Sequence, residues 1–150
     1  MPKTVTGVEP NHTTTLSICA TGRPATLSEG TYSPILDLEG CNPTFNGNVV
    51  NWNPMDQGGW QRAAITGKGL TLSCTAKRNY GSTGNDYIAG LMLATGQSCE
   101  SAAKIEWPNG DIMYIPCVIN VKNRGGNTVD LEQIEFDILG DGQPTYVPAS

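Results

Sequence analysis

The sequence predicts a single, mainly β domain with one short helix packed against a sheet. The chain has 150 residues, 18 of them Gly, and only 15% are charged, a composition common in β-rich proteins with many turns. Residues 70–77 alternate apolar and polar, which is the period of a half-buried strand. Residues 85–95 carry apolar side chains at helical spacing and end at Gly96. Because so short a helix is unstable alone in water, we expect it to dock on the sheet.

The N-terminal third begins as a polar arm over residues 1–14. A strand is predicted over residues 16–20, where apolar and polar side chains alternate until Gly22 and Pro24. Residues 24–59 are rich in Pro, Asn and Gly, and only 49–53 resemble a strand. We therefore expect a long loop that binds a partner, since its apolar side chains would otherwise face water. These side chains are Tyr32, Ile35, Leu36, Phe45 and Trp52.

The C-terminal half predicts a strand over 60–66, then the strand and helix described above, and a linker over 97–103. Asn109-Gly110 separates two apolar runs, 104–107 and 112–121, and this dipeptide is a strong hairpin signal. Pro116 in the second run predicts a sheet edge or a bulge.

A turn over 123–127 precedes the last predicted strand, residues 128–139. On this strand Ile134, Phe136 and Ile138 share one face, while Glu135 and Asp137 share the other. Residues 140–150 are expected to be an extended tail.

Charge and cysteine content exclude several classes of protein. The net charge is −5 and the nine Lys and Arg residues are scattered, which argues against a nucleic-acid-binding surface. There is no apolar signal segment and no run near the roughly 20 residues that span a bilayer. We expect a cytosolic protein without membrane contact. The five widely spaced cysteines favour reduced, buried thiols over disulfides, metal or redox roles.

Candidate catalytic residues do not assemble into a site, so an enzyme, a cofactor and a metal centre are not expected. His12 is the only histidine and lies in the polar arm. The sequence Gly67-Lys68-Gly69 lacks the spacing of a phosphate loop and precedes a strand. The acidic residues Glu132, Glu135 and Asp137 are more consistent with a solvent-exposed strand face than with acid/base chemistry or a cation site.

Two basic residues and three tryptophans leave alternatives open. Lys77 and Arg78 beside Tyr80 could touch a nucleic acid, but an ion pair to Asp86 or to a neighbouring subunit is favoured. The tryptophans could form a ligand platform, but in a chain with two Phe they are more readily explained as core or interface anchors. They are Trp52, Trp60 and Trp107.

Several motifs together resemble the major tail tube proteins of long-tailed bacterial viruses. They are TGKG at 66–69, KRNYG at 77–81, GNDY at 84–87, PNG at 108–110, and EFD at 135–137 followed by GQPTY at 142–146. The resemblance covers about residues 52–148. It implies a tail-tube-type β-sandwich or barrel of two packed antiparallel sheets with one flanking helix and long loop and arm extensions.

The resemblance also implies a structural virion protein, assembled in the host cytoplasm, whose subunits form rings of six that stack into a hollow tube for DNA delivery. The arms and the 24–59 loop would contact the next ring. Other partners would be the tape-measure, tail terminator and distal tail or baseplate proteins. Inter-subunit contacts are expected at Tyr32, Ile35, Leu36, Phe45, Trp52, Lys77 and Arg78.

DNA would pass through the lumen of such a tube without specific binding. A ring of six subunits would carry a charge of −30, and a lumen lined by Glu132, Glu135 or Asp137 would repel DNA. The alternatives are a free-standing β-sandwich that binds carbohydrate through Trp52 and Trp60, a head-decoration protein, and the inner tube of a contractile tail.

Overall fold

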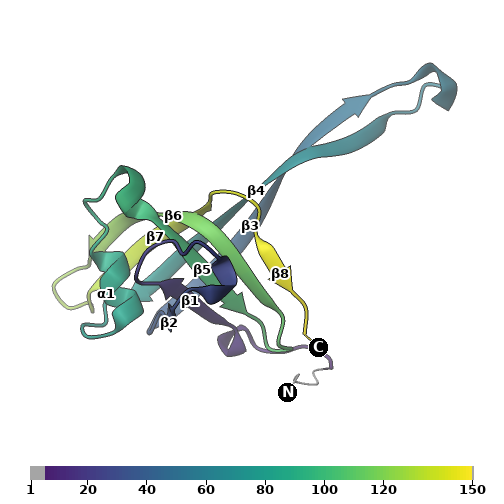
Figure 1. Ribbon diagram of the computed structural model, residues 1–150. Coiled ribbons are helices and arrows are strands. Elements are labelled where there is room, and N and C mark those ends of the chain that lie inside the picture. The colour runs from purple at the N-terminus through teal and green to yellow at the C-terminus, as the bar shows by residue number, and fades with distance from the viewer. Residues whose placement is uncertain (1–5, 150) are drawn as a thin grey trace.

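The computed structural model describes residues 6–149 and has a barrel-like body from which one long β-hairpin projects (Figure 1). The strands are β1 (Thr15–Cys19), β2 (Tyr32–Pro34), β3 (Leu38–Trp52), β4 (Arg62–Lys77), β5 (Glu100–Glu106), β6 (Ile112–Gly125), β7 (Gln133–Gly140) and β8 (Thr145–Val147). The helix α1 spans Thr83–Ala89, and four short 3-10 helices span Asn11–Thr13, Leu27–Glu29, Met55–Gln57 and Gly96–Cys99.

The mainly β fold with one short helix is confirmed, but the strands form one antiparallel sheet rather than two. Its order is β2-β1-β5-β6-β7-β4-β3, and β8 pairs with β6. Residues 112–118 of β6 pair with β5, and residues 117–125 pair with β7, with a bulge between Val121 and Asn123 inside this second pairing. Long strands that bulge can curl a sheet around a core, so a single sheet encloses one hydrophobic cluster.

That cluster follows the apolar alternation of the sequence. Leu72 and Ala76 of β4, Ile115 of β6 and Phe136 of β7 are fully buried in it. Ile88 of α1 covers the same cluster, which is how the short helix docks on the sheet. The helix is shorter than predicted, because it ends at Ala89 with Gly90 as its C-cap, well before Gly96.

The hairpin predicted around Asn109-Gly110 is confirmed as β5 and β6. Gly110 has a φ of 96° and its N–H donates to the carbonyl of Trp107, as a tight turn requires. Pro116 lies in a central strand and not at a sheet edge. It falls between the part of β6 that pairs with β8 and the part that pairs with β7, so its missing N–H costs the sheet little.

Two predicted irregular segments turn out to contain strands. The C-terminal tail includes β8, and the Ala149 N–H donates to Asp111 Oδ1 at 2.8 Å, which holds the tail to the β5–β6 turn. The prediction of little regular structure over 24–59 is wrong, because β3 occupies residues 38–52. The two strands expected over 60–66 and 70–77 are one continuous strand, β4, which begins at Arg62.

No helix among residues 6–149 has both the length and the apolar character needed to cross a membrane.

Candidate assembly surfaces

The outer part of the β3–β4 hairpin pairs with no other strand among residues 6–149. Pairing between β4 and β7 begins at Thr71 and Leu139, so from Leu70 outward β4 pairs only with β3. Residues 44–69 contain no buried side chain. An isolated two-stranded hairpin is marginally stable in water. The long projection in Figure 1 is therefore a candidate surface for contact with a partner.

Both faces of this hairpin carry exposed apolar side chains. Phe45, Val49 and Ile65 share the face that continues the core side of β4, because a bulge between Asn48 and Val49 keeps them in phase. On the other face Arg62 stacks on Trp52, with its guanidinium carbon 5.6 Å from the ring centroid. Exposed apolar surface of this extent marks an interaction site.

The turn that joins β3 to β4 also exposes large apolar side chains. Trp60 is 79% exposed, and Met55 is fully exposed. Trp60 follows Gly58 and Gly59, which both have positive φ, at 62° and 90°. The glycines let the turn reverse the chain and leave the indole at the tip. An exposed Trp in this position is a typical interface anchor.

A second group of exposed apolar side chains lies at the opposite end of the body, in the turns after β4, after α1 and between β6 and β7 (Figure 1). The members of this group, which we call the far-end patch, are Tyr80, Met92, Leu93, Val129 and Leu131. The Tyr80 hydroxyl donates to Glu132 and accepts from Arg124 Nη2 at 3.1 Å, and Arg124 Nε lies 2.8 Å from Glu132 Oε2. The hydrogen bonds from Tyr80 and Arg124 hold the pKa of Glu132 below its ordinary value, so this carboxylate stays ionised at neutral pH.

Glu135 and Asp137 lie on the outer face of the sheet, as alternation predicted. Their register partners are Thr75 and Ser73 of β4, and this face also carries Asn120. Asp137 Oδ1 is 3.2 Å from Lys122 Nζ, whereas Glu135 accepts a hydrogen bond from the Gln133 amide at 3.1 Å and has no cationic partner in the described structure.

Glu132 precedes β7 and belongs to the Tyr80 and Arg124 cluster. Lys77 Nζ lies 3.3 Å from Glu39 Oε1. Without Arg62 and Lys68, which lie on the projecting hairpin, this region of β3, β4, β6 and β7 therefore presents four carboxylates (Glu39, Glu132, Glu135, Asp137) against three basic side chains (Lys77, Lys122, Arg124). Its net charge is about −1, which is much weaker than the three acidic residues alone indicate.

Arg78 acts within the subunit. Its side chain is only 8% exposed, and Nη1 lies 2.7 Å from Asp86 Oδ1 and 3.0 Å from Asn85 Oδ1. The predicted ion pair to Asp86 is therefore present. The guanidinium also stacks on Tyr80, 4.3 Å from the ring centroid, so Arg78 positions the start of α1 and one member of the far-end patch.

Tyr32 and Ile35 are also engaged inside the subunit. Ile35 is buried, and its N–H donates to the Leu16 carbonyl at 3.1 Å. The Tyr32 ring packs 5.6 Å from that of Tyr114, and burial raises the pKa of Tyr32 to about 12. Leu36 is half exposed. Of the predicted contact residues, the structure leaves Leu36, Phe45 and Trp52 with large exposed apolar surfaces.

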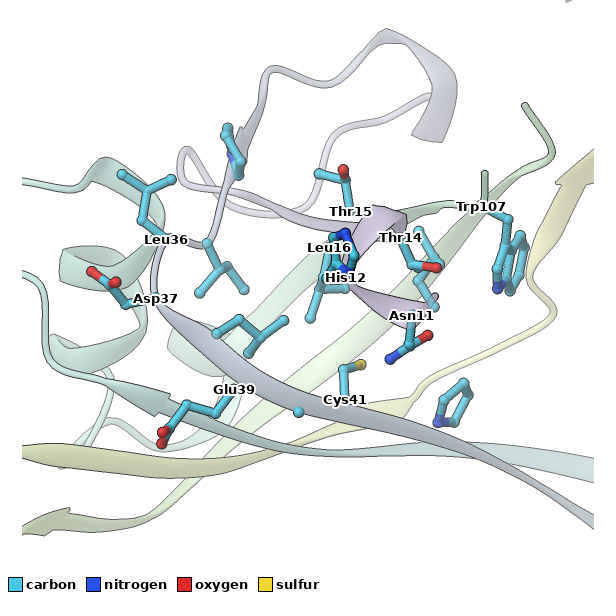
Figure 2. Close-up of a pocket in the computed structure, with 16 residues that line it drawn as sticks. Asn11, His12, Thr14, Thr15, Leu16, Leu36, Asp37, Glu39, Cys41 and Trp107 are labelled. Atoms are coloured by element: carbon cyan, nitrogen blue, oxygen red, sulfur yellow. The ribbon is translucent and has the colours of Figure 1, made fainter. Parts of the chain in front are cut away.

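A pocket of about 450 Å³ lies between β3 and the start of β1 (Figure 2). His12, Leu36, Glu39, Cys41 and Trp107 are among its lining residues. These residues come from separate segments of the chain, which is why sequence patterns did not reveal the pocket. Among the described residues, no group of three or more His, Cys, Asp and Glu side chains is arranged to hold a metal ion.

Comparisons with known proteins identify solved structures that share this fold. No protein-family model and no curated protein matches the chain. A chain from the tail of an empty gene transfer agent particle, solved with helical refinement in C6 symmetry, matches with a TM-score of 0.73 and 14% identity. The match covers 94% of this chain and 100% of the other.

The fold is therefore shared with a chain from a gene transfer agent tail. A chain from the virion of a native gene transfer agent particle matches with a TM-score of 0.70, 14% identity and the same coverage. Since coverage of 94% leaves about nine residues outside each match, most of β3 and β4 lies within the region compared. The resemblance to tail tube proteins is confirmed at the level of the fold.

Proposed function

We propose that this protein is the repeating subunit of a hollow tail tube, built from stacked rings of six, through which DNA leaves a virus-like particle. The observation that carries the proposal is the projecting hairpin, which exposes apolar side chains on both faces and at its tip. A subunit meant to remain alone in solution would leave this surface in water at a large cost. The C6 symmetry of the tail with the matching fold supports six subunits per ring.

The two groups of exposed apolar side chains fit a stack of identical rings. Stacking is a head-to-tail contact, so each subunit must present two different surfaces that complement each other. The hairpin and the far-end patch lie at opposite ends of the molecule (Figure 1). In this proposal the hairpin of one ring packs on the far-end patch of the next ring, which would cover both.

Contacts within a ring would use the open edges of the sheet. β2 and β3 are the end strands of the sheet, and in the described part of the chain no strand pairs with the outer side of the 15-residue β3. A free edge of this length favours pairing with another chain. Joining of neighbouring sheets would give a continuous inner barrel, and Pro43 in β3 fits an edge position because it has no N–H to donate.

The tube proposal predicts the behaviour of the purified protein at high concentration. We expect hollow tubes or stacked rings in negative-stain electron microscopy, together with a high-mass species in size-exclusion chromatography. A protein that stays monomeric at every concentration and binds a glycan would contradict the tube and favour the carbohydrate-binding alternative. Tape-measure, terminator and distal tail or baseplate proteins remain the proposed partners in the particle.

The lumen is proposed to be the polar outer face of β4, β6 and β7. With Asp137 paired to Lys122 and only Glu135 lacking a cation, this face would repel DNA weakly and bind it little. Replacing Glu135 and Asp137 together by Lys is expected to slow or trap DNA during ejection while tubes still form.

The measurement for this variant is the rate of DNA release from assembled particles. Glu29→Lys, which changes an exposed carboxylate between β1 and β2, is the control and should release DNA at the parental rate. Unchanged release from the double Lys variant would exclude this face as the lumen.

A further inference from the structure

Two of the five cysteines face each other across the root of the hairpin. Cys41 of β3 and Cys74 of β4 are direct register partners in the antiparallel pair. Directly opposite residues in such a pair point to the same face, with Cα atoms about 4.5–5.5 Å apart. This separation falls within the range of about 4.4–6.8 Å that a disulfide spans.

The two thiols differ in access. Cys74 belongs to the buried apolar face of β4 and is 4% exposed. Cys41 is partly exposed and lines the pocket between β3 and β1 (Figure 2). A small molecule can therefore reach Cys41 through the pocket, whereas Cys74 is buried and does not line it.

The two thiols also differ in acidity. A hydrogen bond from Cys74 lowers the pKa of Cys41, and the same hydrogen bond, together with burial, raises the pKa of Cys74. The thiolate is the nucleophile in thiol–disulfide exchange. Cys41 is thus the residue that reacts first, because it is both the accessible and the more acidic thiol.

We propose that Cys41 and Cys74 form a thiol–disulfide site, which a low-molecular-weight disulfide of the glutathione type oxidises to a cross-strand disulfide. The Cys41 thiolate attacks one sulfur of the small disulfide, whose S–S bond breaks and releases one thiolate that takes up a proton. Cys74 then gives its proton to solvent and attacks Cys41 Sγ, which releases the second small thiol. Overall two protein thiols are oxidised and one small disulfide is reduced.

The second step becomes easier once the first has occurred. The main cause of the raised pKa of Cys74 is its hydrogen bond to the Cys41 thiolate. In the mixed disulfide Cys41 carries no charge, so this cause disappears and Cys74 ionises more readily.

The disulfide would join β3 to β4 where the hairpin leaves the body, and would close a loop over residues 42–73. Such a bond restricts the unfolded chain and holds the hairpin root against separation of the two strands. A reducing cytoplasm would keep the thiols free, and an oxidising exterior would favour the bond. The inference goes beyond the tube proposal and holds for the subunit alone.

The test treats the folded, purified protein with glutathione disulfide, digests it with trypsin and identifies linked peptides by mass spectrometry. We expect peptide 69–77, which contains Cys74, linked to the peptide that contains Cys41. That second peptide also holds Cys19, because tryptic cleavage is blocked at Arg23-Pro24. The linkage should therefore persist in a Cys19→Ser variant and be lost in Cys41→Ser.

Thermal unfolding provides the second readout. The oxidised protein should unfold at a midpoint roughly 5–10 °C higher than the reduced protein, and a reductant should reverse the increase. The Cys41→Ser variant, changed at a partly exposed position, should show no increase. Absence of the 69–77 linkage, or a linkage that survives Cys41→Ser, would overturn the proposal.

Discussion

Replacing residues 47–68 by a two-residue Asn-Gly turn is expected to give a folded subunit that no longer forms tubes. Asn46 and Gly69 are register partners, so a tight turn can join them without moving either strand. The removed segment contains no buried side chain. Its loss should therefore change the thermal midpoint by no more than about 2 °C, while removing Val49, Trp60 and Ile65 from the proposed contact with the next ring.

The measurement compares tube formation by electron microscopy with thermal unfolding of the same preparation. Gln57→Ala, which alters an exposed polar side chain near the hairpin tip, is the matched control and should assemble normally. If the shortened subunit still formed tubes like those of the parent, the hairpin could not be the contact between rings. A shortened subunit that unfolds would instead show that the hairpin supports the body.

The elements that sequence patterns predicted correctly are those with one face on the core. Apolar and polar side chains alternate in residues 70–77, in the hairpin around Asn109-Gly110 and in β7, because one face of each strand is buried and the other is exposed to solvent. The structure buries Leu72, Ile115 and Phe136 accordingly. In these segments the alternation of apolar and polar residues marks which side chains are buried, and this burial stabilises the fold.

Most of β3 could not be predicted for the same physical reason. Beyond Cys41 neither face of the strand packs on the core. Apolar and polar residues therefore have no reason to alternate along it, and the sequence shows no strand period. Pro43 and Gly47 also have low strand propensity, and both are tolerated because β3 is the edge of the sheet. The segment has strand geometry because β4 pairs along it.

The candidate contact residues also differ in whether they lie on the core or on the exposed hairpin. Phe45 and Trp52 were identified by their apolar character in a segment without apparent structure, and they are exposed on the hairpin. Ile35 has the same character but lies in the core, since its N–H pairs with β1. Sequence alone does not distinguish them, because the distinction depends on which part of 24–59 pairs with the body. The far-end patch has no local signature at all.

The largest loss of stability from a single truncation is expected at Phe136. Its side chain is fully buried, and its register partners are Cys74 of β4 and Val121 of β6. Because these paired strands cannot move together, loss of the phenyl group would leave a cavity that does not close. Phe136→Ala should lower the free energy of unfolding by about 3–5 kcal/mol. This corresponds to a fall in the thermal midpoint of roughly 10 °C. Phe136→Leu, which refills most of the volume, should cost less than about 1.5 kcal/mol.

The chain offers a matched control, because its only other phenylalanine is Phe45 on the exposed hairpin. Phe45→Ala should leave the free energy of unfolding within about 0.5 kcal/mol of the parent, yet weaken tube formation. Phe136→Ala should do the reverse wherever the subunit remains folded, since the core does not face another copy. Equal effects of the two substitutions on unfolding would mean that the hairpin packs on its own body. Equal effects on assembly in folded protein would remove Phe45 from the contact between subunits.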